Sequence, residues 1–215
     1  MGLYAKHVLP RMIDKLLGTA EAESTRARVC GGLHGDVVEI GFGSGRSAAH
    51  LPAGVTGLWV VEPSATARRL AEPRTASAPV PVEWAGLDGQ RLDLPDARFD
   101  TALSTWTLCT VPDATAALRE LARVLKPGGT LHFVEHGASD EPGVRRWQER
   151  LQPINGRVAG GCHLERPIAE LITSAGFDMV DLRNYYAKGD PKPFGFRYEG
   201  IARRVGPDRA EPGHP

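Results

Sequence analysis

The sequence has few cysteines, no excess of either charge and no long apolar run. Of its 215 residues three are cysteines, Cys30, Cys109 and Cys162, and no two of them form the CxxC pair that often holds zinc. Their odd number and wide spacing do not suit a disulfide framework. We therefore expect reduced thiols, no metal ion and a cytoplasmic protein.

The charges balance, because Lys plus Arg and Asp plus Glu each number 26. Such a chain has no overall field that attracts a polyanion, so we expect a small-molecule substrate and no nucleic acid. Polar residues interrupt the first 18 positions, MGLYAKHVLPRMIDKLLG, too often for a signal peptide or a membrane span. We expect no membrane insertion and a monomer or homodimer.

The length suits one main domain, and neither an internal repeat nor a Ser- or Gly-rich linker divides the chain. Apolar residues at helical spacing predict a helix over residues 4–17, and a second helix is expected over residues 20–29. The expected organisation is an N-terminal helical lid over residues 1–30, the main domain over residues 31–205 and a disordered tail over residues 206–215.

Within the main domain, short apolar runs alternate with helical ones, which predicts an α/β fold. The expected strands cover residues 37–40, 57–61, 80–84, 99–104, 130–135, 177–184 and 196–203. The expected helices cover residues 47–50, 64–70, 113–125 and 166–175. This order predicts a doubly wound, Rossmann-like, seven-stranded, mostly parallel sheet with helices on both faces. The last two runs have no helix between them, so they predict an antiparallel pair at the edge, with the last strand antiparallel.

A glycine-rich turn follows the first strand in VVEIGFGSG. Gly41, Gly43 and Gly45 occupy alternate positions, where glycine permits positive φ and lets the backbone approach a ligand closely. The dinucleotide fingerprint GxGxxG requires a glycine at position 46, where this chain has Arg46. The turn therefore favours a ligand without a pyrophosphate.

Acidic residues follow the next two strands, at the edge where such sheets bind ligands. Glu62 is placed to accept hydrogen bonds from both ribose hydroxyls of a nucleoside, and Asp88 from an adenine amino group. Glu39, near the end of the first strand, is placed to bind a cationic amino group directly or through water. The other residues expected at this cofactor site are Pro63, Gly89, Ser104 and Thr105.

These motifs resemble those of the class I S-adenosylmethionine-dependent methyltransferases: EIGFGSG their first motif, VEPS the ribose-binding acid, and LDGQRLDLPDARFD the adenine segment. The segments TLCTV, FVEHGAS and GCHLERP are similar to those of the thiol S-methyltransferases within that class. This resemblance implies S-adenosylmethionine as cofactor and small thiols or hydrogen sulfide as acceptors. It also implies a membrane anchor in vertebrate members, which this sequence does not display.

The acceptor side of the site is expected to hold few catalytic groups. A sulfonium methyl is already electrophilic, so the protein mainly has to align donor and nucleophile, and a thiol with a pKa of roughly 8.5 needs little help from a base. His136, after a predicted strand, is the candidate catalytic base or positioning residue, although it could equally bond a loop carbonyl. The candidate substrate-binding residues are Trp106, Cys162 and His163, with the alternative that they are ordinary core and surface residues. Cys109 is expected to pack after its strand.

Other functions also suit this pattern. A quinone, lipid or other small-metabolite C-, O- or N-methyltransferase would use the same cofactor site. From other classes, the alternatives are a nicotinamide-dependent reductase and a non-catalytic cofactor-binding module. Arg46 and the lack of a Tyr-xxx-Lys pair count against the reductase.

Overall fold

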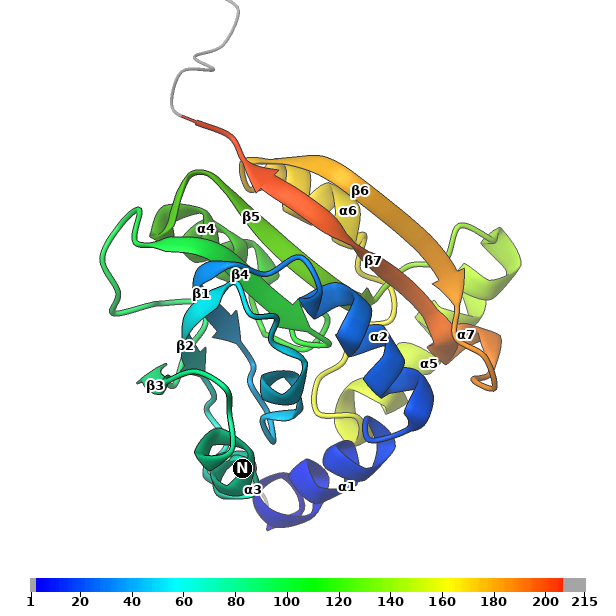
Figure 1. Ribbon diagram of the computed structural model, residues 1–215. Coiled ribbons are helices and arrows are strands. Elements are labelled where there is room, and N and C mark those ends of the chain that lie inside the picture. Colours follow the sequence, from blue (N-terminus) through cyan, green and yellow to red (C-terminus); the bar gives the residue numbers. More distant parts are fainter. Residues whose placement is uncertain (1–2, 207–215) are drawn as a thin grey trace, which may run out of the picture.

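Seven strands form one sheet in the computed structural model, which describes residues 3–206 (Figure 1). The strands are β1 (Gly35–Ile40), β2 (Val55–Val61), β3 (Val82–Gly86), β4 (Phe99–Thr105), β5 (Leu125–His136), β6 (Phe177–Tyr186) and β7 (Phe196–Arg204). Their order is β3-β2-β1-β4-β5-β7-β6, with β7 antiparallel to both neighbours. This confirms the predicted sheet and its antiparallel last strand. Except for its first residue, the predicted tail over residues 206–215 lies outside the described residues.

Helices cover both faces of the sheet, as predicted (Figure 1). The helical elements are η1 (Tyr4–Val8), α1 (Leu9–Leu16), α2 (Ala20–Cys30), η2 (Arg46–His50), α3 (Ala65–Ala76), α4 (Ala114–Val124), α5 (Pro142–Val158), α6 (Ile168–Ser174) and α7 (Lys192–Gly195). Three of the helices begin at side-chain caps: Thr19, Ser64 and Asp113 each accept a hydrogen bond from the backbone N–H three residues later.

The core has two parts because both faces of a parallel sheet are covered. On one face Phe99 and Phe133 pack in a cluster with Leu121 of α4 and Ile172 of α6. A second cluster, which includes Val37 and Leu58 of the sheet, joins Val29 and Cys30 of α2. Because strands buried on both faces have apolar residues in unbroken runs, these runs were readable as strands in the sequence.

The predicted helix over residues 4–17 is divided at Val8, where the π-helical η1 gives way to α1. In a continuous α-helix, residue 10 would donate its backbone N–H to the Lys6 carbonyl, but Pro10 has no N–H. The Lys6 carbonyl instead accepts a hydrogen bond of 2.6 Å from the hydroxyl of Thr66 in α3. This bond joins the N-terminal segment to α3, beside which α1 lies in Figure 1.

No helix was predicted over the residues of α5. Its apolar residues do recur at helical spacing, at Val144, Trp147, Leu151, Ile154 and Val158. Three of these five, Trp147, Ile154 and Val158, are exposed, whereas the polar Gln148 and Asn155 are buried, so most of the apolar stripe does not face the core.

Smaller differences concern the ends of elements. Helix α3 continues to Ala76 with Pro73 inside it, and β5 starts at Leu125 with an irregular register before Thr130. The short α7 lies between β6 and β7, where no helix was expected. Within the described residues, no helix combines the length and apolar character needed to cross a membrane.

Candidate functional site

The candidate site residues gather where the parallel strands β1 to β5 end, since parallel neighbours have their carboxyl ends at one edge. The glycine turn follows β1, Glu62 and Pro63 follow β2, Asp88 and Gly89 follow β3, Ser104 and Thr105 end β4, and His136 ends β5. The edge thus brings together side chains that lie up to about a hundred positions apart along the chain.

The glycine turn combines tight packing with one open position. Gly41, Gly43 and Gly45 all have positive φ, of 68°, 59° and 79°. A Cβ at Gly41 would overlap Thr107, and one at Gly45 would come within 3.0 Å of the Phe42 ring. At Gly43 the nearest atom to such a Cβ is 3.9 Å away. Of the three glycines, Gly43 is therefore the one with open space beside it.

Glu62 is held by the turn that it faces. Its Oε2 accepts a hydrogen bond of 2.8 Å from the Gly43 N–H, and its Oε1 accepts one of 2.7 Å from the Ser64 N–H. Burial raises the pKa of this carboxyl, while the two backbone N–H groups oppose the rise. Each carboxylate oxygen retains acceptor capacity for a second donor.

Glu39 lies deeper, with 1% of its surface exposed. Its Oε2 accepts a hydrogen bond of 2.6 Å from the Ser47 hydroxyl. Burial raises the pKa of Glu39 to about 8, and the hydrogen bond from Ser47 and the charge of Arg26 only partly offset this effect. The carboxyl is thus poised to ionise when a cation arrives.

Asp88 differs from the two glutamates because its side chain is exposed. Its Oδ1 accepts hydrogen bonds of 2.9 Å from the backbone N–H and the side-chain amide of Gln90, which lower its pKa. The neighbouring Gly89 lies close to Ile40, and Pro63 is exposed. This corner of the edge is the more open one.

The loop after β4 is fixed by Glu135, a residue that the sequence reasoning did not select. Its buried carboxylate accepts hydrogen bonds from the Ser104 hydroxyl (2.7 Å) and from the backbone N–H groups of Thr107 and Cys109 (both 3.0 Å). The Ser104 side chain, expected to face the cofactor, is therefore engaged within the protein. The only signal for Glu135 was its acidic character inside a buried strand.

Two thiols and an imidazole meet beside this loop. Nδ1 of His136 lies 3.9 Å from Sγ of Cys109 and 3.8 Å from Sγ of Cys162. Contact with Cys162, together with burial, raises the pKa of the Cys109 thiol. Cys109 and Cys162 are buried, whereas His136 is half-buried. Sequence spacing could not reveal this group because its members come from three separate segments.

Two further predicted acceptor residues have other surroundings. Trp106, with φ of 53°, is 6% exposed, and the guanidinium carbons of Arg26 and Arg197 lie 4.9 Å and 5.5 Å from the centre of its ring. His163 pairs with Glu165 through a contact of 3.1 Å. Trp106 is thus a buried wall of the edge, and His163 lies on the more exposed side.

The N-terminal helices are joined to the glycine turn by ion pairs. Nε of Arg46 donates to Asp14 of α1 over 2.8 Å, and its Nη1 donates to Glu23 of α2, also over 2.8 Å. Asp14 accepts a further hydrogen bond of 2.6 Å from the Ser44 hydroxyl. Residues of both helices therefore contact the turn that the cofactor is expected to occupy.

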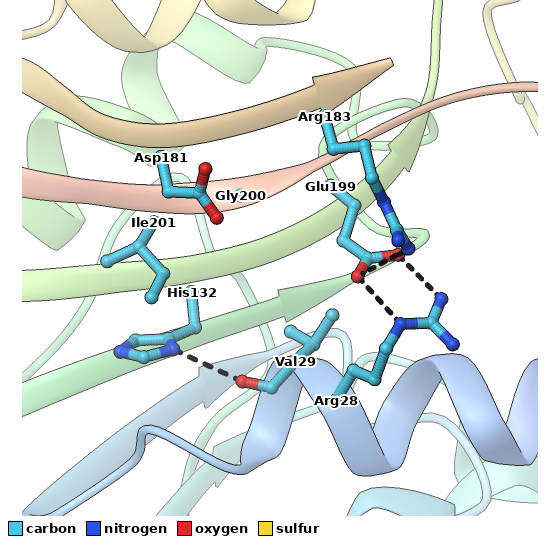
Figure 2. Close-up of a pocket in the computed structure, with 8 residues that line it drawn as sticks. All are labelled: Arg28, Val29, His132, Asp181, Arg183, Glu199, Gly200 and Ile201. Atoms are coloured by element: carbon cyan, nitrogen blue, oxygen red, sulfur yellow. Dashed lines mark hydrogen bonds and ion pairs between the residues drawn. The ribbon is translucent and has the colours of Figure 1, made fainter. Parts of the chain in front are cut away.

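A separate hollow of about 320 Å³ lies beside α2, over the face of β5, β7 and β6 (Figure 2). Figure 2 shows Glu199 between Arg28 and Arg183 in this hollow, with His132 below it. Burial would raise the pKa of Glu199, but hydrogen bonds from Arg28, Tyr185 and Arg183 outweigh it and lower the pKa. Both guanidinium groups thus pair with the one carboxylate of Glu199, and the hollow lies away from the edge that holds the glycine turn.

The chain is similar to known methyltransferases. A family described as a methyltransferase domain matches residues 38–133. Thiol S-methyltransferase TMT1B of Rattus norvegicus is 38% identical over 47% of this chain and 40% of its own length. Phosphatidylethanolamine N-methyltransferase of Cereibacter sphaeroides is 35% identical over 74% of this chain and 80% of its own length. The chain spans less than half the length of the thiol S-methyltransferases that it matches.

The fold is shared with solved methyltransferase structures. N-methyltransferase NodS of Bradyrhizobium japonicum WM9, in complex with S-adenosyl-L-homocysteine, has a TM-score of 0.66 at 18% identity. The match covers 88% of this chain and 90% of that one. This likeness concerns the fold.

Proposed function

The chain belongs to the class I S-adenosylmethionine-dependent methyltransferases, and from this premise we propose that it transfers the methyl group to the sulfur of a small thiol. The membership decides against the nicotinamide-dependent reductase and the non-catalytic module considered above.

The carboxyl edge fits a nucleoside with a cationic amino-acid end. Gly43 leaves open space in front of the turn, and both oxygens of Glu62 retain acceptor capacity for ribose hydroxyls. Glu39 would hold the amino group, and Asp88 would accept from the adenine. When bound, the cofactor supplies a methyl group on a positively charged sulfur, which needs no further activation.

The observation that carries the choice of a thiol is the environment of His136 at the end of β5. It offers one imidazole and two sulfurs, and within residues 3–206 no Asp or Glu carboxylate oxygen joins this group. Such a site suits an acceptor that is partly ionised near neutral pH, as a thiol is, and for which a weak base suffices. The similarity to a thiol S-methyltransferase supports the same choice.

A second candidate is N-methylation of an amino-phospholipid. The observation in its favour is the similarity to phosphatidylethanolamine N-methyltransferase, which covers 80% of that protein. A primary amine is protonated near neutral pH and must lose a proton before it can accept the methyl group. His136 would therefore have to deprotonate an ammonium group, which is a weaker acid than imidazolium.

The test is an acceptor screen that measures S-adenosyl-L-homocysteine formation with small thiols, with phenols and with phosphatidylethanolamine vesicles. We expect turnover with thiols, and a His136→Gln variant that keeps cofactor affinity but loses rate most strongly at low pH, where the free thiol is protonated. Turnover with phosphatidylethanolamine but not with thiols would replace the first candidate by the second.

A further inference from the structure

Cys109, His136 and Cys162 converge from the loop after β4, the end of β5 and the segment after α5. We infer that these three side chains form a zinc site whose fourth position is open to a thiolate. The expectation of no metal rested on the absence of a CxxC pair, which says nothing about ligands from separate segments.

The spacing of the three ligand atoms suits a tetrahedral ion. Bonds of about 2.3 Å to sulfur and about 2.0 Å to nitrogen place these atoms about 3.6 Å apart in a tetrahedral zinc site. The observed separations of Nδ1 from the two sulfurs are 3.9 Å and 3.8 Å, and no two of the three atoms are more than 4.8 Å apart. Small side-chain movements would close these gaps.

Buried hydrogen bonds hold the two cysteine segments in place. Glu135 binds the N–H of Cys109, and the N–H of His163 donates to the Cys109 carbonyl over 2.7 Å. From α5, Gln152 and Asn155 donate to the Cys162 carbonyl over 3.1 Å and 2.7 Å. Supporting contacts of this kind orient metal ligands and raise their affinity. They also explain why α5 buries Asn155.

The ligand types favour zinc among the common divalent ions. Two thiols and an imidazole select a soft or borderline cation over magnesium or calcium. On binding, both thiols release their protons to solvent and His136 coordinates through its neutral Nδ1. No change of oxidation state is involved.

Three protein ligands leave one position free, as in catalytic zinc sites. Within the described part of the chain, no fourth Cys, His, Asp or Glu joins the group. The chemistry that fits this position is an acceptor thiol, which would lose its proton on coordination and bind as the thiolate. With zinc bound, His136 would serve as a ligand, and the ion rather than the imidazole would promote ionisation of the thiol. The metal site itself stands independently, but this role rests on the proposed function.

Cobalt substitution tests the site on the full chain. Co²⁺ titrated into reduced, chelator-treated protein should bind with one ion per chain and give the sulfur-to-cobalt charge-transfer band and tetrahedral visible bands. Cys109→Ser, Cys162→Ser and His136→Ala should each weaken Co²⁺ binding at least about 100-fold. The matched controls are Cys30→Ala, which removes a buried thiol elsewhere, and His163→Ala, which removes the adjacent imidazole.

Circular dichroism of each metal-free variant shows whether it folds, and a rise in melting temperature with Zn²⁺ in wild type but not in Cys162→Ser gives a second readout. No charge-transfer band in wild type, or bands unchanged in the ligand variants, would overturn the site. Thiol methylation that persists in chelated protein lacking any band would reject the metal and leave the proposed function standing. Charge-transfer and visible bands in a protein that does not methylate thiols would support the metal site and reject the proposed function.

Discussion

The guanidinium of Arg46 donates through Nε to the carboxylate of Asp14 over 2.8 Å, and each side chain is 21% exposed. Arg46 follows the glycine turn, whereas Asp14 lies in α1. The residue that replaces the third fingerprint glycine therefore has a second role, which is to hold the N-terminal helices against the cofactor edge. Asp14 also lies 3.4 Å from Arg74 of α3, so one carboxylate is shared by two guanidinium groups.

Asp14→Asn should loosen the N-terminal helices, because it removes the charge that faces Arg46 and Arg74. We expect the free energy of unfolding to fall by about 1 kcal/mol and cofactor dissociation to accelerate about fivefold, the factor that this energy represents. Stopped-flow displacement of S-adenosyl-L-homocysteine measures the rate. Glu141→Gln, which breaks the exposed ion pair with Lys192, is the matched control and should change neither quantity. An unchanged dissociation rate in Asp14→Asn would show that residues 3–30 do not act as a lid.

Gly43→Ala tests whether the open space before the turn receives the cofactor. Alanine at φ of 59° costs about 1–2 kcal/mol of strain, and its methyl group would project into that space. Gly128→Ala is the control, because Gly128 has a similar φ of 78°, also has open space, and lies near the start of β5. We expect both variants to lose similar stability but only Gly43→Ala to bind S-adenosyl-L-homocysteine at least about tenfold more weakly. Equal binding by the two would place the cofactor elsewhere.

The strands and the glycine turn could be predicted from the sequence because their signals are local. Apolar runs such as the one around Val37 mark strands buried on both faces, and three alternate glycines mark a turn with positive φ. Helix α5 was readable in principle, since Val144, Trp147 and Leu151 recur at helical spacing. The burial of its polar residues Gln148 and Asn155 was not readable, because it depends on hydrogen bonds to the backbone of flanking loops. The division at Val8 was readable in principle from the nearby Pro10, but the partner of the Lys6 carbonyl was not.

The candidate site likewise has one part that could be predicted from the sequence and one part that could not. Glu62 and the glycines lie beside one another because successive parallel strands share an edge, which the strand order alone implies. The grouping of Cys109 with His136 and Cys162 depends on how loops fold over that edge, and on a buried carboxylate, Glu135, that has no local signature. Residue type suggested that such groups matter, whereas only the folded structure shows which of them meet.

Glu62 and Asp88 should contribute unequally to cofactor binding. Glu62 is 7% exposed and fixed by two backbone N–H groups, whereas Asp88 is exposed and, among the described residues, hydrogen-bonded to Gln90 alone. Glu62→Ala should weaken S-adenosyl-L-homocysteine binding about 30- to 100-fold, or about 2–3 kcal/mol, and Asp88→Ala less than about tenfold. Isothermal titration calorimetry measures both. Full affinity in Glu62→Ala would contradict the assignment of the ribose site.

His132 should make the protein sensitive to mild acid. Burial lowers its pKa to about 4, and the neutral ring donates from Nδ1 to the Val29 carbonyl over 3.1 Å. The unfolded chain binds a proton near pH 6.5 and the folded one does not, so stability is lost as the pH falls from about 6.5 to about 4. The loss attributable to His132 is about 3 kcal/mol. Urea unfolding at pH 7.5 and 4.5 should show a smaller difference for His132→Asn than for wild type. Equal differences would mean that His132 titrates normally in the fold.

Glu39 should release a proton when the cofactor binds. Its pKa of about 8 keeps it mostly protonated at pH 7, and a cationic amino group beside it would favour the ionised form. Binding should therefore release close to one proton at pH 7, and progressively fewer as the pH rises above about 8 because the carboxyl is then already ionised. Calorimetry of S-adenosyl-L-homocysteine binding in buffers of different ionisation enthalpy counts these protons. Glu39→Gln, which keeps the shape and the acceptor for Ser47, should abolish the buffer dependence. If wild type and Glu39→Gln show the same dependence, the proton comes from another group, and Glu39 does not face the amino end.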